Sequence, residues 1–157
     1  MIHVTCAIIR NEDNEVLVVQ RGEKTDHPFK WEFPGGKLNK NEAEEDCIIR
    51  EIREELSIDV VICSRMNEVE YDYGIKQIRL IPFICDTLDE LPLLTEHVAF
   101  RWIAPEQIES LDYSEADIIV ARNYLAHSGT LISKTESSPK NSDDSSNDTE
   151  LRAMIER

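Results

Sequence analysis

The stretch GKLNKNEAEEDCIIREIREELSI at residues 36–58 carries the most regular pattern in the sequence. Its first glycine is followed after five residues by Glu42, and Glu42 is followed after seven residues by REIREE at 50–55. A helix is expected to begin after Asn41, because Asn is a good N-cap and a glutamate stands three residues farther on. The same pattern predicts that this helix ends near Leu56.

The predicted helix has an apolar face beside an acidic face. At about 100° per residue, the aliphatic side chains share one sector of the helical wheel: Ile48, Ile49, Ile52 and Leu56. The carboxylates Glu51, Glu54 and Glu55 share the adjoining sector. Each like-charge pair at this spacing costs about 0.2–0.5 kcal/mol, so a bound hard cation such as Mg²⁺, which prefers oxygen ligands, accounts for the cluster. The alternative is a solvated acidic face that pairs locally with Arg50 and Arg53.

Predicted strands and helices alternate along the rest of the chain. The expected strands are at residues 4–9, 15–20, 31–33, 61–70, 77–85 and 100–103, the first two forming a hairpin. A turn that favours glycine is expected at 34–36, a short helix at 105–109 and a longer helix at 115–125. This interleaving predicts an α/β or α+β layer fold.

Composition favours one soluble domain, because the chain has 157 residues, 41% of them hydrophobic, and a formal net charge of −15. Such a charge repels a nucleic-acid backbone, so no nucleic-acid polymer is expected as a partner. With no run of about 18 apolar residues and no secretory signal pattern, we expect no membrane association and a cytoplasmic location. The four cysteines are scattered without a CxxC pair and are interpreted as buried free thiols.

The sequence predicts a domain at residues 1–127 followed by a polar, acidic, disordered tail at 128–157. From 133 to 148 the chain is rich in Ser, Asn and Asp, which cannot offset the entropy cost of ordering by burial. Leu151, Met154 and Ile155 stand at helical spacing, and we interpret them as frayed coil, with docking to a partner as the alternative. The sequence is compatible with a monomer or a homodimer.

The pattern at residues 36–58 resembles the Nudix box, GX5EX7REUXEEXGU with U an aliphatic residue. It matches at every specified position except Ser57, which stands in place of the last glycine. That position favours positive φ, so Ser57 is expected to strain the helix end or to shift it by one residue. The resemblance covers most of residues 3–125 and is closest to the MutT and CTP pyrophosphohydrolase branch. It implies an α/β/α sandwich with a mixed β-sheet between helices.

The resemblance also implies a metal site and a catalytic set. The residues that would bind Mg²⁺ or Mn²⁺ are Gly35, through its carbonyl, Glu51, Glu54, Glu55 and Glu96. The catalytic set comprises Glu54, Glu51, Glu55, Glu96 and Arg50. Within it, Glu96 acts as a further ligand or as the general base, and Arg50 orients the glutamates through its guanidinium. Glu42 is given a supporting role near the helix N-terminus.

Three residues are implied to bind substrate: Arg21, Lys37 and Asp117. Lys37 does not belong to a P-loop, because no glycine stands five residues before Gly36 and no Ser or Thr follows the lysine. Arg21 faces substrate in the family, against an ordinary surface arginine as the alternative. Asp117 has two evenly weighted interpretations: it reads the nucleobase edge, or it is a favourable helix-start charge three residues after an N-cap at Ser114.

The resemblance implies a magnesium-dependent hydrolase that converts nucleoside triphosphates, including oxidised or modified ones, to monophosphates and pyrophosphate. One alternative is a Nudix hydrolase of ADP-ribose or a dinucleoside polyphosphate, in which Tyr71 and Tyr73 stack a second base instead of packing in a strand. Another alternative is a Nudix-fold binding module without catalysis. The intact glutamates of the box argue against that last alternative.

Overall fold

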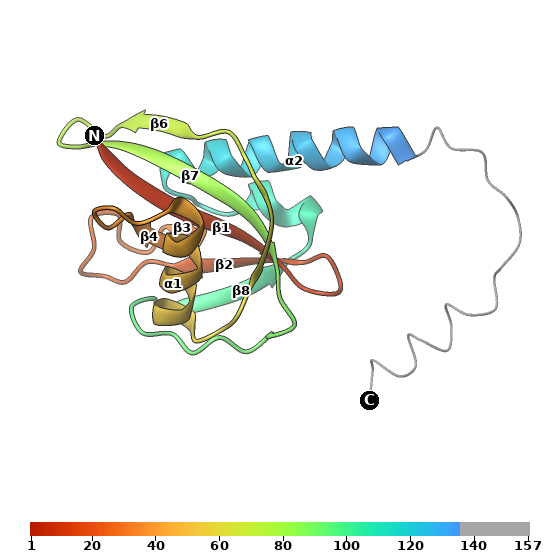
Figure 1. The fold of residues 1–157 in the computed structure, drawn as a ribbon, viewed down its shortest axis with the longest axis horizontal. Coiled ribbons are helices and arrows are strands. Elements are labelled where there is room, and N and C mark those ends of the chain that lie inside the picture. The colour runs from red at the N-terminus through yellow and green to blue at the C-terminus, as the bar shows by residue number, and fades with distance from the viewer. Residues whose placement is uncertain (136–157) are drawn as a thin grey trace, which may run out of the picture. The chain divides into compact units, whose positions relative to one another are not determined.

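The computed structural model describes residues 1–135. In chain order its elements are β1 (Ile2–Arg10), β2 (Val16–Gln20), β3 (Trp31–Glu32), β4 (Gly35–Lys37), α1 (Glu44–Leu56), β5 (Val61–Arg65), β6 (Val69–Asp72), β7 (Gln77–Asp86), β8 (Ala99–Ile103), the 3₁₀ helix η1 (Pro105–Ser110) and α2 (Glu115–Thr135). Figure 1 shows α1 on one face of the sheet and the first turns of α2 on the other. The predicted α/β/α layering is confirmed.

The strands form one mixed sheet with β1 near its centre. Their hydrogen-bonded order is β3-β2-β1-β7-β5, with β4 beside β1, β6 beside β7 and β8 beside β2. β1 runs parallel to β7 from Ile2 to Arg10. Its other edge is divided, because β4 pairs with residues 4–6 and β2 pairs at Arg10. The predicted opening hairpin is present, but its strands diverge and β4 takes the place beside the first half of β1.

Both faces of the sheet are buried, and side chains alternate between them along β1. Cys6 and Ile8 pack in a cluster with residues of α2 such as Tyr124, whereas Ala7 and Ile9 pack in a second cluster with residues of α1. A strand buried on both faces requires a continuous apolar run, which residues 4–9 supply apart from Thr5. The predicted apolar stripe of α1 is confirmed, since Ile48, Ile52 and Leu56 are fully buried in the second cluster.

Helix α1 begins later than the sequence pattern suggested. Its N-cap is Ala43, with φ −70° and ψ 147°. Within the described residues, no side chain caps this end with a hydrogen bond. Asn41 instead has φ 61°, and Glu42 accepts a hydrogen bond from the Asn39 N–H at 2.9 Å. The capping box fails because the Glu42 carboxylate holds a turn before the helix. Three acidic residues in the first helical turn still favour this end electrostatically.

Replacing Ala43 with serine should stabilise the protein by about 1 kcal/mol, because a serine hydroxyl can accept a hydrogen bond from one of the unsatisfied N–H groups of the first turn. The extended backbone of Ala43 already has the conformation that an N-cap residue requires. The measurement is the urea midpoint of A43S against wild type, with K40S as a control that adds a serine outside the cap. An unchanged midpoint in A43S would show that another group already satisfies this helix end.

Ser57 ends α1 without shifting its boundary. It adopts the left-handed conformation, with φ 54° and ψ 36°, and its N–H donates to the Arg53 carbonyl at 3.0 Å. The helix ends at Leu56 as predicted, and the expected shift by one residue is wrong. A non-glycine residue therefore occupies the position where the left-handed conformation favours glycine.

Two other local predictions are wrong for identifiable reasons. The turn expected at 34–36 is largely strand, because Gly35 and Gly36 lie against residues of β1 in β4. The strand expected at 61–70 is two strands, β5 and β6, which pair with different parts of β7. Pro82 of β7 lies opposite the break and has no N–H to donate, while its carbonyl accepts from the Met66 N–H at 2.9 Å.

The last helix is longer than expected. α2 continues to Thr135 and so runs across the boundary expected at 127, although internal contacts group Met1–Ala126 as one compact unit. The rest of the predicted tail lies outside the described residues. Among the cysteines, Cys6, Cys47 and Cys85 are buried as expected, but Cys63 is exposed because β5 is an edge strand.

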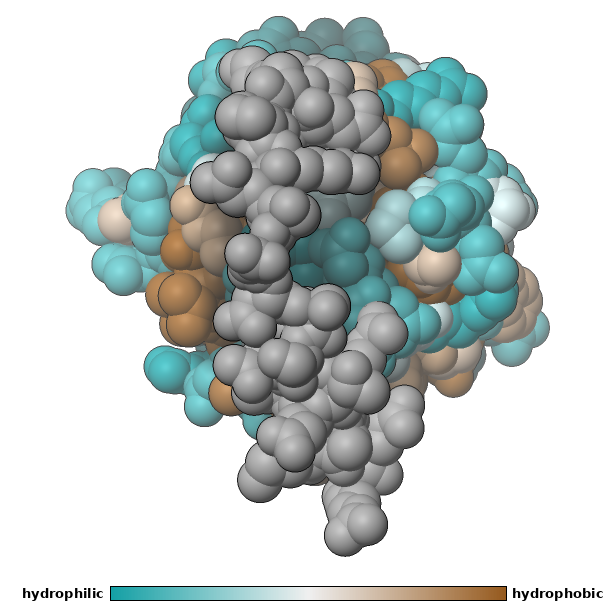
Figure 2. All heavy atoms as spheres, turned by 90° about the vertical axis from the view of Figure 1, so that its right-hand side faces the viewer, coloured by the Kyte–Doolittle hydropathy of each residue, from teal (hydrophilic) through white to brown (hydrophobic). Residues whose placement is uncertain are grey.

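The surface is largely hydrophilic. On the face seen in Figure 2, apolar side chains of the described chain form separate groups among hydrophilic ones. None of the helices in the described part of the chain has the length and apolarity needed to cross a membrane.

Candidate functional site

One cleft of about 600 Å³ contains every residue that was predicted to bind metal or substrate. These are Arg21, Gly35, Lys37, Glu51, Glu54, Glu55, Glu96 and Asp117. The cleft therefore joins the acidic face of α1, the glycine strand β4, the end of β2 and the start of α2. Arg50 stands outside this lining and contacts it through the carboxylates. A second cavity of about 710 Å³ lies around the loops after β1 and β7, apart from these residues.

The two glycines of β4 allow a close approach that no other residue permits. A Cβ on Gly35 would collide with the backbone carbonyl of Thr5, and a Cβ on Gly36 would collide with the carboxylate of Glu51. Glu51 therefore lies directly against the backbone of β4. This explains why a Gly-Gly pair precedes the acidic helix: it brings the main chain of the strand against the carboxylates.

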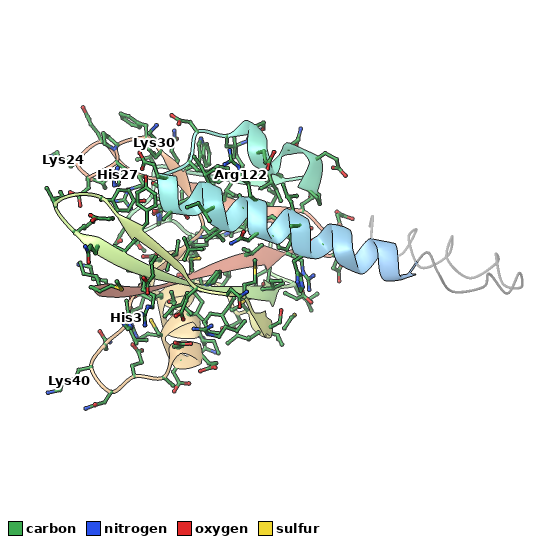
Figure 3. The ribbon with its side chains drawn as sticks, turned by 90° about the horizontal axis from the view of Figure 1, so that it is seen from above. His3, Lys24, His27, Lys30, Lys40 and Arg122 are labelled. Atoms are coloured by element: carbon green, nitrogen blue, oxygen red, sulfur yellow. The ribbon has the colours of Figure 1, made fainter. Side chains whose placement is uncertain are left out.

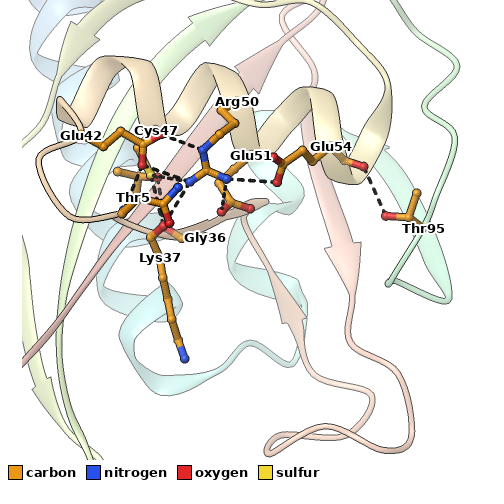
Figure 4. Close-up of polar contacts among 10 residues, drawn as sticks. Thr5, Gly36, Lys37, Glu42, Cys47, Arg50, Glu51, Glu54 and Thr95 are labelled. Atoms are coloured by element: carbon orange, nitrogen blue, oxygen red, sulfur yellow. Dashed lines mark hydrogen bonds and ion pairs between the residues drawn. The ribbon is translucent and has the colours of Figure 1, made fainter.

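Arg50 holds three carboxylates with one guanidinium (Figure 4). Its Nε donates to Glu42 at 2.6 Å, and its Nη1 donates to Glu51 at 2.9 Å and to Glu54 at 3.0 Å. The bonds to Glu42 and Glu51 raise the pKa of Arg50, and the bond from Arg50 is the main reason that the pKa of Glu42 falls to about 2. This geometry supports the orienting role predicted for Arg50 and the supporting role predicted for Glu42.

Glu55 is the buried member of the acidic face, with 8% of its surface exposed. Burial is the main cause that raises its pKa to about 8, and the charges of Glu51, Glu96 and Glu32 add to it. Its Oε2 atom is buried and has no hydrogen-bond partner among the described residues. An unpartnered buried carboxylate oxygen is costly, so this atom is suited to a cation or a donor that enters the cleft.

The carboxylates do not form a preassembled metal cage. Within residues 1–135, no three His, Cys, Asp or Glu side chains converge closely enough to hold a metal ion. The cause is visible in Figure 4, where Glu51 and Glu54 turn to Arg50. The donor set still fits a hard divalent cation, because it combines carboxylate oxygens, one of them unpartnered, with the backbone of β4. Glu54 is 59% exposed, so little packing opposes a change of its rotamer.

A triad of hydrogen-bonded side chains, Arg21, Glu32 and His97, also lines the cleft. Glu32 accepts from Nη1 of Arg21 at 2.9 Å and lies 2.8 Å from Nε2 of His97. Burial raises the pKa of Glu32, but the hydrogen bonds from His97 and Arg21 outweigh it, and the pKa lies below its usual value. Arg21 is thus fixed in the cleft by Glu32. Sequence reasoning missed this role of Glu32, although a glutamate between Trp31 and Phe33 in a short apolar strand was a usable signal.

Asp117 lies in the first turn of α2, and its carboxyl makes a contact that the sequence did not predict. Its Oδ1 accepts from the Phe33 N–H at 3.0 Å, so it ties α2 to the chain after β3. The N-cap expected at Ser114 is not formed, because its hydroxyl is buried and has no partner among the described residues. Burial is the main cause that raises the pKa of Asp117 to about 8, with Glu32 adding to it. Near neutral pH the carboxyl is therefore largely protonated and can donate one hydrogen bond.

This pKa predicts how stability depends on pH. Between about pH 4 and pH 8 the folded Asp117 keeps a proton that the unfolded carboxyl has released, so its contribution to stability is lost as pH rises through this window. The amide in D117N does not titrate, so its melting temperature should fall less over the same range. Parallel melting curves, with D112N as an exposed control, measure the difference. Equal slopes for wild type and D117N would show that Asp117 is ionised in the folded protein.

Tyr73 lines the cleft and also makes contacts at the start of α2. Its hydroxyl accepts from the Ala116 N–H at 3.1 Å, which satisfies the start of α2. Its ring lies 4.6 Å from that of Tyr71 and 4.8 Å from that of His27, centroid to centroid. Figure 3 shows His27 on the loop between β2 and β3, near the start of α2. These contacts favour the strand-packing interpretation of Tyr71 and Tyr73.

Lys37 lines the same cleft from the end of β4. Its carbonyl accepts from Arg50 at 3.3 Å, whereas its ammonium group extends away from the cluster of carboxylates in Figure 4. The charged end of this side chain is exposed and is placed to meet a ligand that enters the cleft.

Comparisons with known proteins agree with this site. The model of the NUDIX domain family matches residues 1–123. The CTP pyrophosphohydrolase of Escherichia coli (strain K12) is 31% identical over 130 residues, which cover 80% of this chain and 93% of that protein. The 8-oxo-dGTP diphosphatase of Proteus vulgaris is 37% identical over 83 residues, which cover 53% of this chain and 74% of that protein.

A solved structure gives the same result for the fold. The crystal structure of a MutT protein from Methanosarcina mazei Go1 matches with a TM-score of 0.72 and 27% identity, covering 82% of this chain and 94% of that one. The family model spans most of the chain, and Gly36, Glu51, Glu54 and Glu55 of the Nudix box line the cleft. This chain therefore belongs to the NUDIX family.

Proposed function

We propose that this NUDIX hydrolase is a nucleoside triphosphate pyrophosphohydrolase that depends on Mg²⁺ or Mn²⁺ and releases nucleoside monophosphate and pyrophosphate. The observation that carries the proposal is the composition of the cleft that contains the acidic face of α1. It unites the oxygen donors of α1 and β4, the cationic side chains of Arg21 and Lys37, and a buried hydrogen-bonding group at Asp117. A charged phosphate chain and a polar base edge are the two parts of a nucleotide that such a cleft can bind.

Each wall of the cleft has a distinct task in this proposal. A bound divalent cation would supply charge neutralisation and an activated water. Glu51, Glu54, Glu55 and Glu96 would hold that cation, and one of them would accept the proton of the attacking water. Arg50 keeps Glu51 and Glu54 in place. Arg21 and Lys37 bind phosphate oxygens, and attack on the β-phosphorus releases pyrophosphate.

The names of similar proteins suggest which nucleotides to test first. CTP pyrophosphohydrolase and 8-oxo-dGTP diphosphatase both name nucleoside triphosphates as substrates of those relatives. We propose the same class for this chain, with oxidised or modified nucleotides included. The packing of Tyr73 against Ala116 and Tyr71 disfavours the alternative in which these rings stack a second base.

A substrate panel tests the proposal. The panel holds canonical and 8-oxo nucleoside triphosphates, ADP-ribose and a dinucleoside tetraphosphate, each with Mg²⁺, and phosphate release is read with and without added inorganic pyrophosphatase. We expect phosphate from the triphosphates when the pyrophosphatase is present. Phosphate release without pyrophosphatase, or turnover of ADP-ribose or the dinucleotide alone, would contradict the proposal.

Replacing Asp117 should change the ranking of bases. Asparagine keeps an acceptor for the Phe33 N–H and a donor, as the protonated carboxyl of Asp117 does, whereas alanine keeps neither. An unpaired polar edge costs about 1–3 kcal/mol, or roughly 5- to 150-fold in kcat/KM. D117A should therefore redistribute kcat/KM among the triphosphates and cost the preferred nucleotide more than the others, and D117N should retain more of the wild-type ranking. An unchanged ranking with a lowered melting temperature would mean that Asp117 serves only to join α2 to Phe33.

A further inference from the structure

The Glu32 side chain contacts two parts of the cleft at once. One carboxylate oxygen meets Arg21 at the end of β2, and the other meets His97 in the segment before β8. The exposed fraction of the side chain is 18% for Glu32 and 6% for His97. Polar contacts at this depth are screened weakly by solvent, so the Glu32 carboxylate depends on both partners to stay in place.

The segment 93–98 carries Glu96 and is tied down at both ends. Its start is bonded to the last turn of α1, through the Leu93 N–H to the Leu56 carbonyl at 2.8 Å and the Thr95 N–H to the Glu55 carbonyl at 3.3 Å. Its end is bonded to β2, through the Val98 N–H to the Gln20 carbonyl at 3.0 Å.

Between these anchors, the side chains of the adjacent residues Glu96 and His97 point in different directions. Glu96 is exposed toward the cleft, whereas the His97 side chain turns inward to Glu32. The direction of the Glu96 side chain therefore depends on how firmly His97 is held.

We propose that Glu32 is a positioning residue that fixes two groups in place. One of its carboxylate oxygens holds Arg21, and the other holds the segment that carries Glu96. The proposal rests on the function given above, because it assumes that Arg21 binds phosphate and that Glu96 serves the metal-dependent step. Glutamine is a poor replacement for Glu32 in this task. Its amide has no charge to pair with Arg21, and its NH₂ group can meet His97 only when the imidazole accepts at Nε2, which is a different tautomer from the one that donates to the carboxylate.

The kinetic test separates the effect of Glu32 on Glu96 from its effect on Arg21. E32Q should lower kcat roughly 10- to 100-fold, the cost of a displaced reacting group, and should raise KM. In the E96Q background, adding E32Q should leave kcat unchanged within about threefold, because no carboxylate remains to be positioned. In the R21A background, adding E32Q should leave KM unchanged. H97Q, which keeps a donor for Glu32, should retain more kcat than H97A.

Hydrogen exchange tests the anchoring without substrate. Amides of residues 93–98 should exchange faster in E32Q and H97A than in wild type, whereas amides of β7 should keep their wild-type rates. E70Q is the matched control, since Glu70 is an exposed glutamate that bonds to Arg79 on β7, away from the cleft. E70Q should change neither kcat nor exchange at 93–98.

The outcomes distinguish the two claims. Wild-type protein that hydrolyses no nucleotide would overturn the proposed function, and exchange at 93–98 would still decide whether Glu32 anchors the segment. An active wild type in which E32Q and E96Q lower kcat independently, so that their effects multiply, would overturn the positioning role. Unchanged exchange at 93–98 in E32Q would overturn it as well, whatever the kinetics.

Discussion

E54Q should lower kcat at least about 100-fold, more than the loss typical of residues that only support a metal ligand. The expectation follows from the position of Glu54 on the acidic face of α1, where it lines the cleft beside Glu51 and Glu55. Its side chain is mostly exposed, and its carboxylate lies 3.0 Å from Arg50 Nη1. The melting temperature should therefore change little, since surface ion pairs contribute about 0–1 kcal/mol.

Steady-state kinetics with Mg²⁺ and with EDTA measure this effect. E45Q is the matched control, because Glu45 is an exposed glutamate in the first turn of the same helix, outside the cleft. It should keep wild-type kcat, and EDTA should abolish turnover in both wild type and E45Q. Near-normal activity of E54Q, or wild-type turnover in EDTA, would exclude the assignment of this helix as a metal site.

G35A should destabilise the fold by about 3 kcal/mol, the upper end of the cost of overpacking. A Cβ at Gly35 would collide with backbone atoms of Thr5 and Cys6, so β4 would have to leave its pairing with β1. Backbone cannot rotate away as a side chain can. The loss of β4 would also remove the main chain that lies against Glu51.

Urea denaturation of G35A and G22A checks this prediction. A Cβ at Gly22 would meet only ordinary contacts, at 3.6 Å from Val98 Cγ1 and 3.7 Å from the Glu96 carbonyl. G22A should therefore change the midpoint much less than G35A does. Equal midpoints for the two variants would mean that β4 can move away from β1 at little cost.

Sequence reasoning predicted the layers and the contents of the cleft because these depend on periodic patterns. The aliphatic stripe and the acidic face of α1 follow from helical geometry alone, and the continuous apolar run of β1 follows from burial on both faces. The resemblance to the family then implied roles for residues that lie far apart in the sequence, such as Arg21, Glu96 and Asp117. The cleft contains all three.

The misses concern interactions that a linear pattern does not contain. The capping box at Asn41 is absent because Asn41 has a positive φ and the Glu42 carboxylate holds a turn before the helix. The turn at Gly35 proved to be a strand because β1 and β2 diverge. Glu32 and His97 meet across 65 positions of sequence, and the resemblance assigned neither of them a role. Each of these depends on tertiary placement, which local propensity does not determine.

The most direct test of the proposed chemistry follows the phosphorus atoms of one reaction. A nucleoside triphosphate that the panel shows to be hydrolysed is incubated with the wild-type protein and Mg²⁺ in water enriched in oxygen-18. The products are then separated, and their masses are measured by mass spectrometry. Attack of water on the β-phosphorus predicts nucleoside monophosphate without the label and pyrophosphate that carries it. Labelled monophosphate, or the formation of nucleoside diphosphate and inorganic phosphate, would contradict the account.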